Sequence, residues 1–402
     1  MLAAAAMASF WGAVFSVKRW IEHLSTNPYS DDFRVYYYAA RLGLQQGWAA
    51  IYDQAVLRGV MGQHFTGDYA IVDGGHTFPN PPSLAWLIAP LTFLPWEAAY
   101  VAWAAIGLAC LVAAWWLAAP SRDFAGVTLL LLAVALWPIH YSLIFGQPTG
   151  EILLLVAAAW WFLRRDRPLE AGIALALATS LKPQDVALVP VALLVSGRLR
   201  VFGWWAAACA ALGAVFFAAL GTKGVADFWS TNVDVQNYAG HQIATLASLV
   251  GPGLPALAFE GAAAAVALVA AWRRRVSLEF VFAAGLAGSV ASALHAHESD
   301  FSMLVLAGWF VLQSPAGLVT RVWMLPGIAA VQAMSLGFAL PILIWEVVWV
   351  VLLAADPGYF SARQRIDTPN GRLVRATSAD SRPKTAASDA FIGPGAGTLK
   401  SD

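Results

Sequence analysis

The sequence predicts an all-α fold, a polytopic bundle of transmembrane helices. Of its 402 residues, 59% are hydrophobic and 12% are charged, and the mean hydropathy is +0.64. Long apolar runs follow one another along the chain, as in proteins that cross a membrane several times. The 24 basic residues balance the 24 acidic ones, so no basic field draws the chain to nucleic acid. The composition therefore excludes a soluble globule and a nucleic-acid-binding protein.

The first predicted span is Leu2–Val17. No basic residue precedes it, and Lys18 and Arg19 follow it, which is the reverse of the layout of a cleaved signal peptide. The segment Lys18–Ser83 contains scattered Pro, Gly, Asp and His residues, with apolar residues at helical spacing in two places. We expect this segment to be a long loop that carries short surface helices.

The second predicted span lies within Leu84–Ala119, which Pro90 and Pro95 divide into a short helix and a span that starts at Trp96. Several later segments are shorter than the roughly 20 residues that a lone transmembrane helix needs, so we expect them to pack inside a bundle. Ten further segments bring the predicted total to about twelve spans: Phe124–Ile139, Glu151–Leu163, Ala171–Leu181, Val186–Val195, Phe202–Leu220, Leu254–Trp272, Leu278–Leu294, Phe301–Leu312, Val322–Met334 and Ile342–Ala355.

Arginine is unevenly distributed over the short loops between these spans. One set of alternate loops holds only Lys182 and Lys223. The other set holds Arg122, Arg164, Arg165, Arg167, Arg198, Arg200, Arg273 to Arg275 and Arg321. The positive-inside rule places the arginine-rich loops and both termini in the cytoplasm and the Lys18–Ser83 loop outside; Lys18 and Arg19 argue for the reverse but are outnumbered.

Two regions follow from this layout. Residues 1–356 are predicted to form the membrane domain, and residues 357–402 to form a disordered cytoplasmic tail, because the tail is rich in Pro, Gly, Ser, Thr and charge and has no apolar period. The cysteines, Cys110 and Cys209, lie inside apolar runs, so we expect small buried hydrophobes and not a disulfide or a metal site.

Polar residues collect on the predicted outer face, and within or beside a bilayer such residues are costly unless they pair or act. Because distant parts of the chain contribute them to one side, we expect a site there, with the stretch around Asp32 as its chemical centre. They form five clusters: Asp31, Asp32 and Arg34; His76 to Pro82; Gly146 and Gln147; Lys182 and Gln184; and His295, His297, Glu298 and Asp300.

Structural explanations compete with a functional one at most of these positions. Asp31 is equally well explained as a helix N-cap. The Pro79–Pro82 segment is typical of a rigid lead-in to a helix, and Lys182 has the position of a lysine that snorkels to the membrane interface. His295 and His297 have a spacing that suits a metal, but a helix would separate their rings and no third ligand is evident, so no metal site is predicted.

A series of short motifs in the chain resembles glycosyltransferase family 87, which belongs to the GT-C superfamily of polytopic membrane glycosyltransferases. No single motif is specific, but their order and spacing are, and they extend over about three quarters of the chain. The motifs are Asp-Phe-Arg-Val-Tyr-Tyr-Tyr-Ala-Ala from Asp32, Ile51-Tyr52-Asp53, Phe78-Pro79-Asn80-Pro81-Pro82, Ala89-Pro90-Leu91, Leu94-Pro95, Gly146-Gln147, Leu181-Lys182-Pro183 and the group from His295 to Asp300.

The resemblance implies a transferase that moves a hexosyl unit, with mannosyl favoured, from a polyprenyl-phosphate donor to a lipid or glycan acceptor. It places the reaction at the extracytoplasmic face of the cell membrane and assigns the role of general base to Asp32. A displacement at the anomeric carbon also needs groups that hold the departing lipid phosphate, and Lys182 fits that role. Further candidates for donor phosphate and sugar contacts are Arg34, Gln147, His297 and Tyr36. Since no nucleotide fold or Asp-x-Asp motif is evident, neither a metal nor another cofactor is expected.

The alternative function is a transporter or flippase of a lipid-linked sugar. Such a protein is expected to carry polar residues through the depth of the membrane, where they line a path. Here the predicted spans are almost free of charge, with Glu260, Glu279 and Glu346 as the main exceptions. That distribution favours an enzyme at the membrane surface. A scaffold protein is a third possibility, which leaves the long Lys18–Ser83 loop unexplained.

Overall fold

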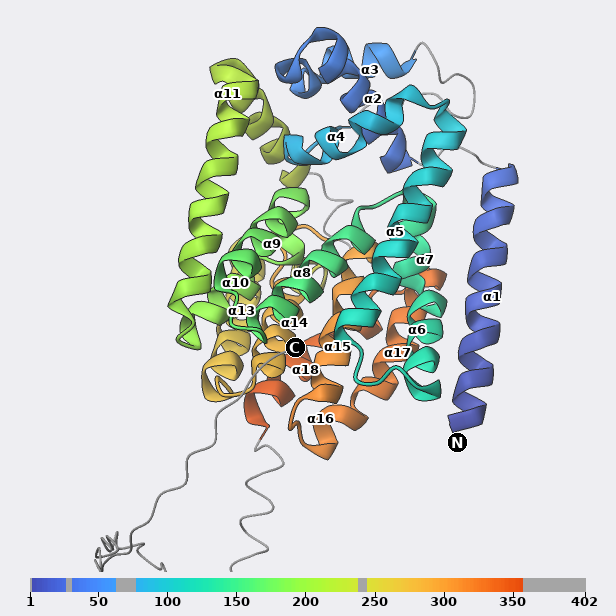
Figure 1. Cartoon of the computed structure of the whole chain (residues 1–402), viewed down its shortest axis with the longest axis vertical. Coiled ribbons are helices and arrows are strands. Elements are labelled where there is room, and N and C mark those ends of the chain that lie inside the picture. The colour runs from blue at the N-terminus through green and yellow to red at the C-terminus, as the bar shows by residue number, and fades with distance from the viewer. Residues whose placement is uncertain (1, 27–30, 63–76, 238–243, 357–402) are drawn as a thin grey trace, which may run out of the picture.

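The computed structural model describes residues 2–26, 31–62, 77–237 and 244–356, and every regular element in these ranges is a helix. The all-α prediction is therefore confirmed for the described part of the chain. Figure 1 shows a bundle of helices beneath an upper layer that contains α2 (Asp31–Gln46), α3 (Gln54–Gly62) and α4 (Pro82–Ile88). Helices α1 (Leu2–Thr26) and α11 (Leu199–Asn237) run along opposite edges of the bundle. The predicted tail, 357–402, lies outside the described residues.

Helix α1 does not end at Val17, where its apolar run stops, but continues to Thr26. Lys18 and Glu22 lie one turn apart in this extension, and their side chains form a salt bridge of 2.9 Å, a pairing that supports an exposed helix. The prediction that a loop begins at Lys18 is therefore wrong. Helix α1 packs against α6 (Phe124–Ala135).

Helix α2 is buried, and the expectation of surface helices in this segment is wrong for it. Phe33, on its first turn, is 0% exposed and lies within a group of aromatic rings. The ring centroids of Trp96, Tyr100 and Trp103 lie 5.4, 5.6 and 6.3 Å from that of Phe33. These three residues belong to α5 (Trp96–Ala118), so aromatic packing of about 0.5–1.5 kcal/mol per pair helps hold the start of α2 against the bundle.

The break predicted at Pro90 and Pro95 is confirmed, since a 3-10 helix, η3 (Ala89–Phe93), separates α4 from α5. The predicted span Phe124–Ile139 is not one helix. Helix α6 ends at Ala135, Leu136 is extended, and α7 (Trp137–Phe145) follows at an angle of 55°.

Proline and glutamine explain the break between α6 and α7. Pro138, in the first turn of α7, has no N–H and cannot continue α6. Gln332 occupies the gap: its Oε1 accepts from the N–H of Trp137 at 2.7 Å and its Nε2 donates to the carbonyl of Ala135 at 3.0 Å. These two bonds satisfy backbone groups that the break leaves without helical partners.

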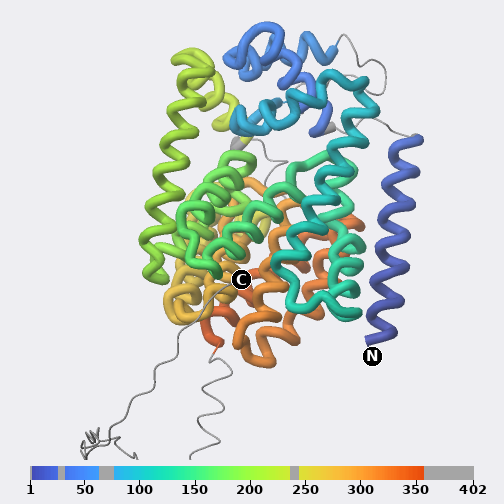
Figure 2. Tube along the Cα trace, viewed as in Figure 1, coloured from blue at the N-terminus to red at the C-terminus, as the bar shows by residue number. Residues whose placement is uncertain are grey.

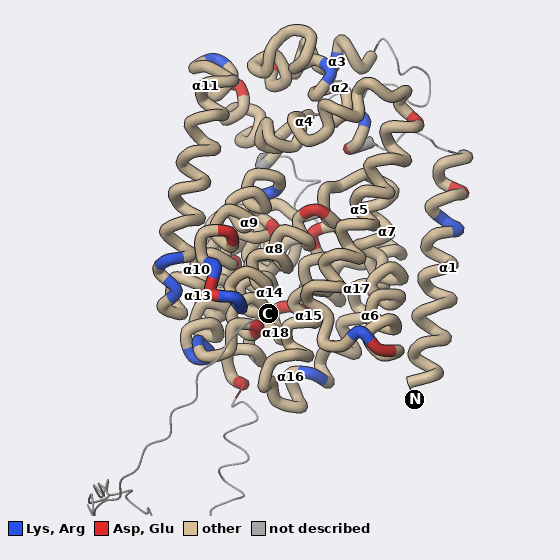
Figure 3. The backbone as a smooth tube through the Cα atoms, in the orientation of Figure 1, with Lys and Arg blue, Asp and Glu red and all other residues tan. Residues whose placement is uncertain are grey.

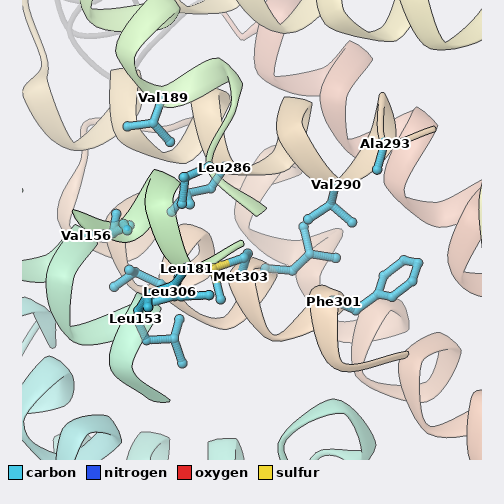
Figure 4. Close-up of a cluster of buried hydrophobic side chains, with 14 of the residues drawn as sticks. Leu153, Val156, Leu181, Val189, Leu286, Val290, Ala293, Phe301, Met303 and Leu306 are labelled. Carbon is cyan, nitrogen blue, oxygen red and sulfur yellow. The ribbon is translucent and has the colours of Figure 1, made fainter. Parts of the chain in front are cut away.

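The middle of the bundle consists of short helices packed on one another, as expected. They are α8 (Thr149–Leu163), α9 (Pro168–Leu181), α10 (Leu188–Val195), α14 (Leu278–Ala291) and α15 (Met303–Gln313). Every residue of α14 from Phe280 to Ala291 is buried. Figure 4 shows apolar side chains from several of these helices lying together, among them Leu153, Leu286 and Leu306.

The remaining helices complete the bundle and the connections. Figure 2 traces the chain through them, from η1 in the blue upper part to α18 in orange-red. The predicted span Val322–Met334 is divided at Trp323 into two helices. Helix α11 continues past Leu220, where the predicted span ends, but it is kinked at Gly221, whose φ is 63°. Their bounds are η1 (Trp48–Tyr52), η4 (Pro183–Asp185), α12 (Ala247–Val250), α13 (Leu254–Arg273), η6 (Glu298–Ser302), α16 (Leu318–Val322), α17 (Met324–Ala333), η7 (Met334–Leu336) and α18 (Leu340–Ala355).

Three helices among the described residues are long and apolar enough to cross a membrane: α5, the part of α11 from Leu199 to Val235, and α13. The bent pair α6 and α7 makes a fourth if it is counted as one span. The predicted span Leu2–Val17 falls on α1, which has 25 residues but is not among these candidate spans, and the remaining predicted spans fall on shorter helices. A membrane protein is indicated, while the number of twelve spans stays a prediction.

The arginine-rich connections meet at one end of the bundle. Arg164 lies 3.5 Å from the carboxylate of Glu279, Arg274 donates to the carbonyl of Pro315 at 3.0 Å, and Arg321 donates to that of Ser314 at 2.7 Å. Figure 3 shows basic positions gathered near this lower end, around α10, α13 and α16. Helices α8, α9, α14 and α15 each have one terminus here, and the other terminus of each lies at the cavity described next.

Candidate active site

A cavity of about 560 Å³ lies between the upper layer and the bundle. Its volume falls within the range of about 300–1,000 Å³ that is usual for ligand pockets. Asp32, Gln147, Lys182 and His297 all line it, although they come from four separate segments of the chain. The structure thus brings together the four residues that sequence reasoning singled out from distant clusters.

Asp32 lies in the first turn of α2, at the wall of the cavity. Its Oδ2 atom accepts a hydrogen bond from Nε2 of Gln147 at 2.5 Å. Hydrogen bonds to an ionised carboxylate are shorter and stronger than neutral ones, so this contact fixes the direction of the Asp32 side chain. Helix α2 begins at Asp31, but the side chain of Asp31 lies outside the described part, so its capping role stays a prediction.

The backbone around Gly146 places Gln147 opposite Asp32. Gly146 ends α7 in the left-handed region at φ 67°, and a Cβ atom there would lie 2.6 Å from Cβ of Phe33. Only glycine fits such a conformation at such a close approach. Trp103 Nε1 donates to the carbonyl of Gly146 at 2.8 Å and holds the turn. Gly146 is therefore a helix boundary, and Gln147, which follows it, is part of the cavity wall.

Lys182 is 3% exposed and ends α9 at the cavity. Its Nζ forms an ion pair with Asp300 and donates to Gln147 Oε1 at 3.3 Å and to Ser299 Oγ at 3.5 Å. An ammonium group has three N–H donors, and these three partners match them. The side chain is therefore buried and paired, and the alternative in which it snorkels to the interface is wrong.

Asp300 anchors this lysine from η6. Its Oδ2 accepts from the backbone N–H of His297 at 3.0 Å, and its Oδ1 accepts from Ser299 Oγ at 3.1 Å. Burial raises the pKa of Asp300, but Lys182 and His297 outweigh burial, and the net shift is downward. Burial likewise lowers the pKa of Lys182, and the surrounding carboxylates, Asp300 first, outweigh it so that the pKa is raised. Both groups are thus ionised at neutral pH.

Asp185 belongs to the same cluster, and sequence reasoning missed it. It is 1% exposed in η4, and neither carboxylate oxygen has a hydrogen-bond partner among the described residues. Burial and the charge of Asp300 raise the pKa of Asp185 well above its ordinary value, against the opposing effect of Lys182. One feature of the sequence could have identified Asp185: it lies three residues after Lys182 and directly before an apolar run.

Of the two remaining predicted site residues, Tyr36 lines the cavity and Arg34 does not. Tyr36 lines the cavity, is 4% exposed, and has a pKa raised by burial first and then by the charge of Asp32. Arg34 is 2% exposed on α2 but does not line the cavity. Tyr36 is thus placed with Asp32 and Gln147, whereas Arg34 is not.

Aromatic and imidazole rings form other parts of the cavity wall. Tyr141 and Phe145 stack with centroids 4.2 Å apart, and the rings of His295 and His297 meet edge to face at 4.7 Å. Exposed aromatic faces are suited to the apolar faces of sugar rings. The sequence analysis named His295 and His297 but not Tyr141 and Phe145. The spacing of the two aromatic residues does not distinguish a residue that lines a cavity from one that packs in the helix core.

The Pro79–Pro82 segment closes the cavity on the side of the upper layer. Pro82 begins α4, so the predicted lead-in to a helix is confirmed. Pro79, Asn80 and Pro81 also line the cavity. Asn232 of α11 donates to the carbonyl of Pro79 at 3.1 Å and links the segment to that helix.

Comparison with known protein families identifies a family that the chain matches. The sequence model of glycosyltransferase family 87 matches residues 78–296, just over half of the 402-residue chain. No curated protein and no solved structure matches. Gln147 and Lys182 lie inside the matched range, while Asp32 and His297 lie outside it.

Proposed function

The chain belongs to glycosyltransferase family 87, and from this membership we propose that it transfers a hexosyl unit, mannosyl being favoured, from a polyprenyl-phosphate donor to a lipid or glycan acceptor. The observation that carries the proposal is the hydrogen-bonded series from Asp32 through Gln147 to Lys182 in one cavity. It sets a carboxylate and a cation in the same pocket, joined by one amide side chain.

In the proposed reaction, a hydroxyl oxygen of the acceptor attacks the anomeric carbon of the donor sugar. The bond from that carbon to the phosphate oxygen breaks, and the lipid phosphate leaves with the electron pair. Asp32 takes the proton of the attacking hydroxyl as general base. The Gln147 bond engages Oδ2 of Asp32 and so orients the carboxylate at the cavity wall.

The departing phosphate needs positive charge and hydrogen-bond donors. Lys182 supplies the charge, since Asp300 and the neighbouring carboxylates keep its ammonium protonated. Its contact with Ser299 is the longest of its three, at 3.5 Å, and is the one that a phosphate oxygen replaces in this proposal. His297 lines the same wall and is the second phosphate contact, while Tyr36 faces the sugar.

The position of the cavity supports a reaction at the extracytoplasmic face. The cavity and the arginine-rich connections lie at opposite ends of α8, α9, α14 and α15. Arginine-rich connections are typical of the cytoplasmic side. In this topology the termini of the chain are cytoplasmic and the site is reached from outside.

Transfer from a lipid-linked donor tests the proposal. Purified protein in nanodiscs is supplied with polyprenyl-phosphate mannose or a nucleotide-linked mannose, with a membrane lipid extract as acceptor. Mass spectrometry of the products should show a hexose added only from the polyprenyl-phosphate donor. Transfer from the nucleotide sugar alone would contradict the proposed donor.

A further inference from the structure

The candidate active-site cavity has a corner that the proposed reaction does not use. It is lined by Asn80, from the segment before α4, and by Phe228 and Asn232 of α11, and we call it the asparagine corner. Asn232 donates from Nδ2 to the carbonyl of Pro79 at 3.1 Å, so its amide lies against the residue that precedes Asn80. The two asparagines are therefore neighbours on the cavity wall.

Asn232 presents an acceptor, and not a donor, to the cavity. Its Nδ2 also donates to the carbonyl of Phe228 at 2.9 Å, so both N–H groups of the carboxamide are used within the protein. Its Oδ1 has no hydrogen-bond partner among the described residues. A phosphodiester oxygen only accepts and cannot bind there, whereas a hydroxyl group can donate to it.

Asn80 adds a second carboxamide with both a donor and an acceptor. The residue is 9% exposed, and its side chain makes no hydrogen bond to any described residue. Its backbone is fixed, because the hydroxyl of Tyr52 donates to its carbonyl at 2.7 Å. Buried carboxamides are nearly always hydrogen-bonded, so an unpaired one at a cavity wall indicates a polar ligand.

An aromatic ring completes the asparagine corner. Phe228 lies one turn before Asn232 and lines the cavity, and its ring packs edge to face on that of Tyr52, with centroids 5.1 Å apart. A sugar has hydroxyls around its rim and C–H groups on its faces. Two carboxamides beside an aromatic ring therefore suit a sugar better than a phosphate or a hydrocarbon chain.

Two contacts place the asparagine corner on the donor side of the cavity. Ser83 donates to the carbonyl of Ser180 and so ties the segment before α4 to the end of α9, where Lys182 is assigned to the donor phosphate. Tyr36, which is assigned to the sugar, packs edge to face on Phe78 of the same segment, with centroids 6.1 Å apart. The asparagine corner thus adjoins both residues assigned to the donor.

We propose that Asn80 and Asn232 bind hydroxyl groups of the sugar that is transferred and thereby select the donor. The inference rests on the proposed function for the identity of the donor. Carboxamides do not ionise, so these residues recognise the sugar and do not take its protons. A donor that lacks one of the recognised hydroxyls leaves a carboxamide unpaired and binds more weakly.

The two asparagines and a nearby glutamine provide the variants. Asn80→Ala removes a side chain that makes no hydrogen bond to the described residues, so the fold should stay intact. Asn232→Ala also breaks bonds within the protein and needs a matched control. Gln54→Ala is that control, because Gln54 donates to Thr231, the neighbour of Asn232, at 3.2 Å but does not line the cavity.

The test measures binding of polyprenyl-phosphate mannose and its monodeoxy analogues, all of one chain length, to purified protein in detergent. Wild type should bind at least one analogue about tenfold more weakly than the mannose donor, as expected when a buried polar group loses its partner. Asn80→Ala and Asn232→Ala should bind that analogue and the mannose donor about equally, while Gln54→Ala should keep the wild-type ratio. A wild-type ratio in Asn80→Ala overturns the inference, and so does loss of the ratio in Gln54→Ala.

A transfer assay on the same variants separates this inference from the proposed reaction. Discrimination in binding without sugar transfer would contradict the reaction and support the asparagine corner. Transfer with the wild-type ratio in both asparagine variants would contradict the asparagine corner alone. A raised KM for the acceptor with unchanged donor binding would overturn the assignment to the donor sugar.

Discussion

The amide nitrogen of Gln147 donates to the Asp32 carboxylate at 2.5 Å, across 115 residues of sequence. This bond joins the upper layer to the bundle at the cavity, since Asp32 belongs to α2 and Gln147 follows α7. A hydrogen bond to the ionised form of a carboxylate favours that form, which is the form a general base needs.

Gln147→Met is expected to lower kcat/KM by about tenfold or more and to move the acid limb of the pH–rate profile to higher pH. The reason is that the loss of the Gln147 bond favours protonation of Asp32, and the protonated carboxyl cannot accept a proton. Gln313→Met is a matched control, because Gln313 also donates a hydrogen bond, to the carbonyl of Ala118 at 2.6 Å, at the far end of the bundle. If the acid limb does not move in Gln147→Met, Gln147 does not tune the base.

The sequence carried enough information to find the main parts of the site but not their contacts. Asp32, Gln147 and Lys182 were visible because polar residues beside membrane-length apolar runs are costly and hence conspicuous. Asp185 has the same character, but a single carboxylate before an apolar run is indistinguishable from a helix-terminal charge until its burial is known. The ion pair of Lys182 with Asp300 spans 118 residues, and no local pattern encodes such a pairing.

In the fold, too, features caused by neighbouring residues could be predicted, whereas features caused by residues far away in the sequence could not. The break before Trp96 follows from Pro90 and Pro95, residues that act on their own backbone. The break after Ala135 depends in part on Gln332, which comes from α17 and stabilises a bend that composition alone does not reveal. The burial of α2 depends on the rings of α5, so its polar, tyrosine-rich sequence was mistaken for a surface helix.

Lys182→Met is expected to destabilise the folded protein by about 3–5 kcal/mol, since it leaves Asp300 buried without its cation. The double variant Lys182→Met with Asp300→Leu should recover most of that stability, because both charges are then replaced by apolar groups. Its transferase activity should stay lost. Thermal melts in detergent and transfer assays on both variants measure the two effects, and full activity in the double variant would remove Lys182 from phosphate binding.

Asp185 should make the stability of the protein depend on pH. Its pKa is raised above the ordinary value of 3.8, so folding favours the protonated form. The stability that Asp185 contributes is complete below that ordinary value and is lost as pH rises through the raised pKa. Asp185→Asn is neutral throughout and should lack this loss, so melting temperatures of the variant and the wild type should diverge as pH rises. Parallel melting curves from acid to alkaline pH would contradict a protonated Asp185.

Fusions to alkaline phosphatase, which is active only outside the cytoplasm, test the proposed orientation. A fusion after Gly62, an exposed residue at the end of α3, should be active, and one after Asp356 should be silent. The expectation follows from the arginine-rich connections, which the positive-inside rule places in the cytoplasm. The reverse pattern would place the cavity on the cytoplasmic side.

Asp32→Asn preserves the size of the side chain and an oxygen that can accept from Gln147, but it cannot take a proton at pH 7. If Asp32 is the general base, transfer from polyprenyl-phosphate mannose should fall by roughly 10²- to 10⁴-fold while the melting temperature stays near that of wild type.

Asp31→Asn is the neighbouring control and should cost far less activity, because the Gln147 bond is made by Asp32 and a capping role for Asp31 is worth only about 1 kcal/mol of stability. Equal activity of Asp32→Asn and wild type would end the assignment of the base. A matched loss in both variants would contradict the assignment of the base to Asp32 alone.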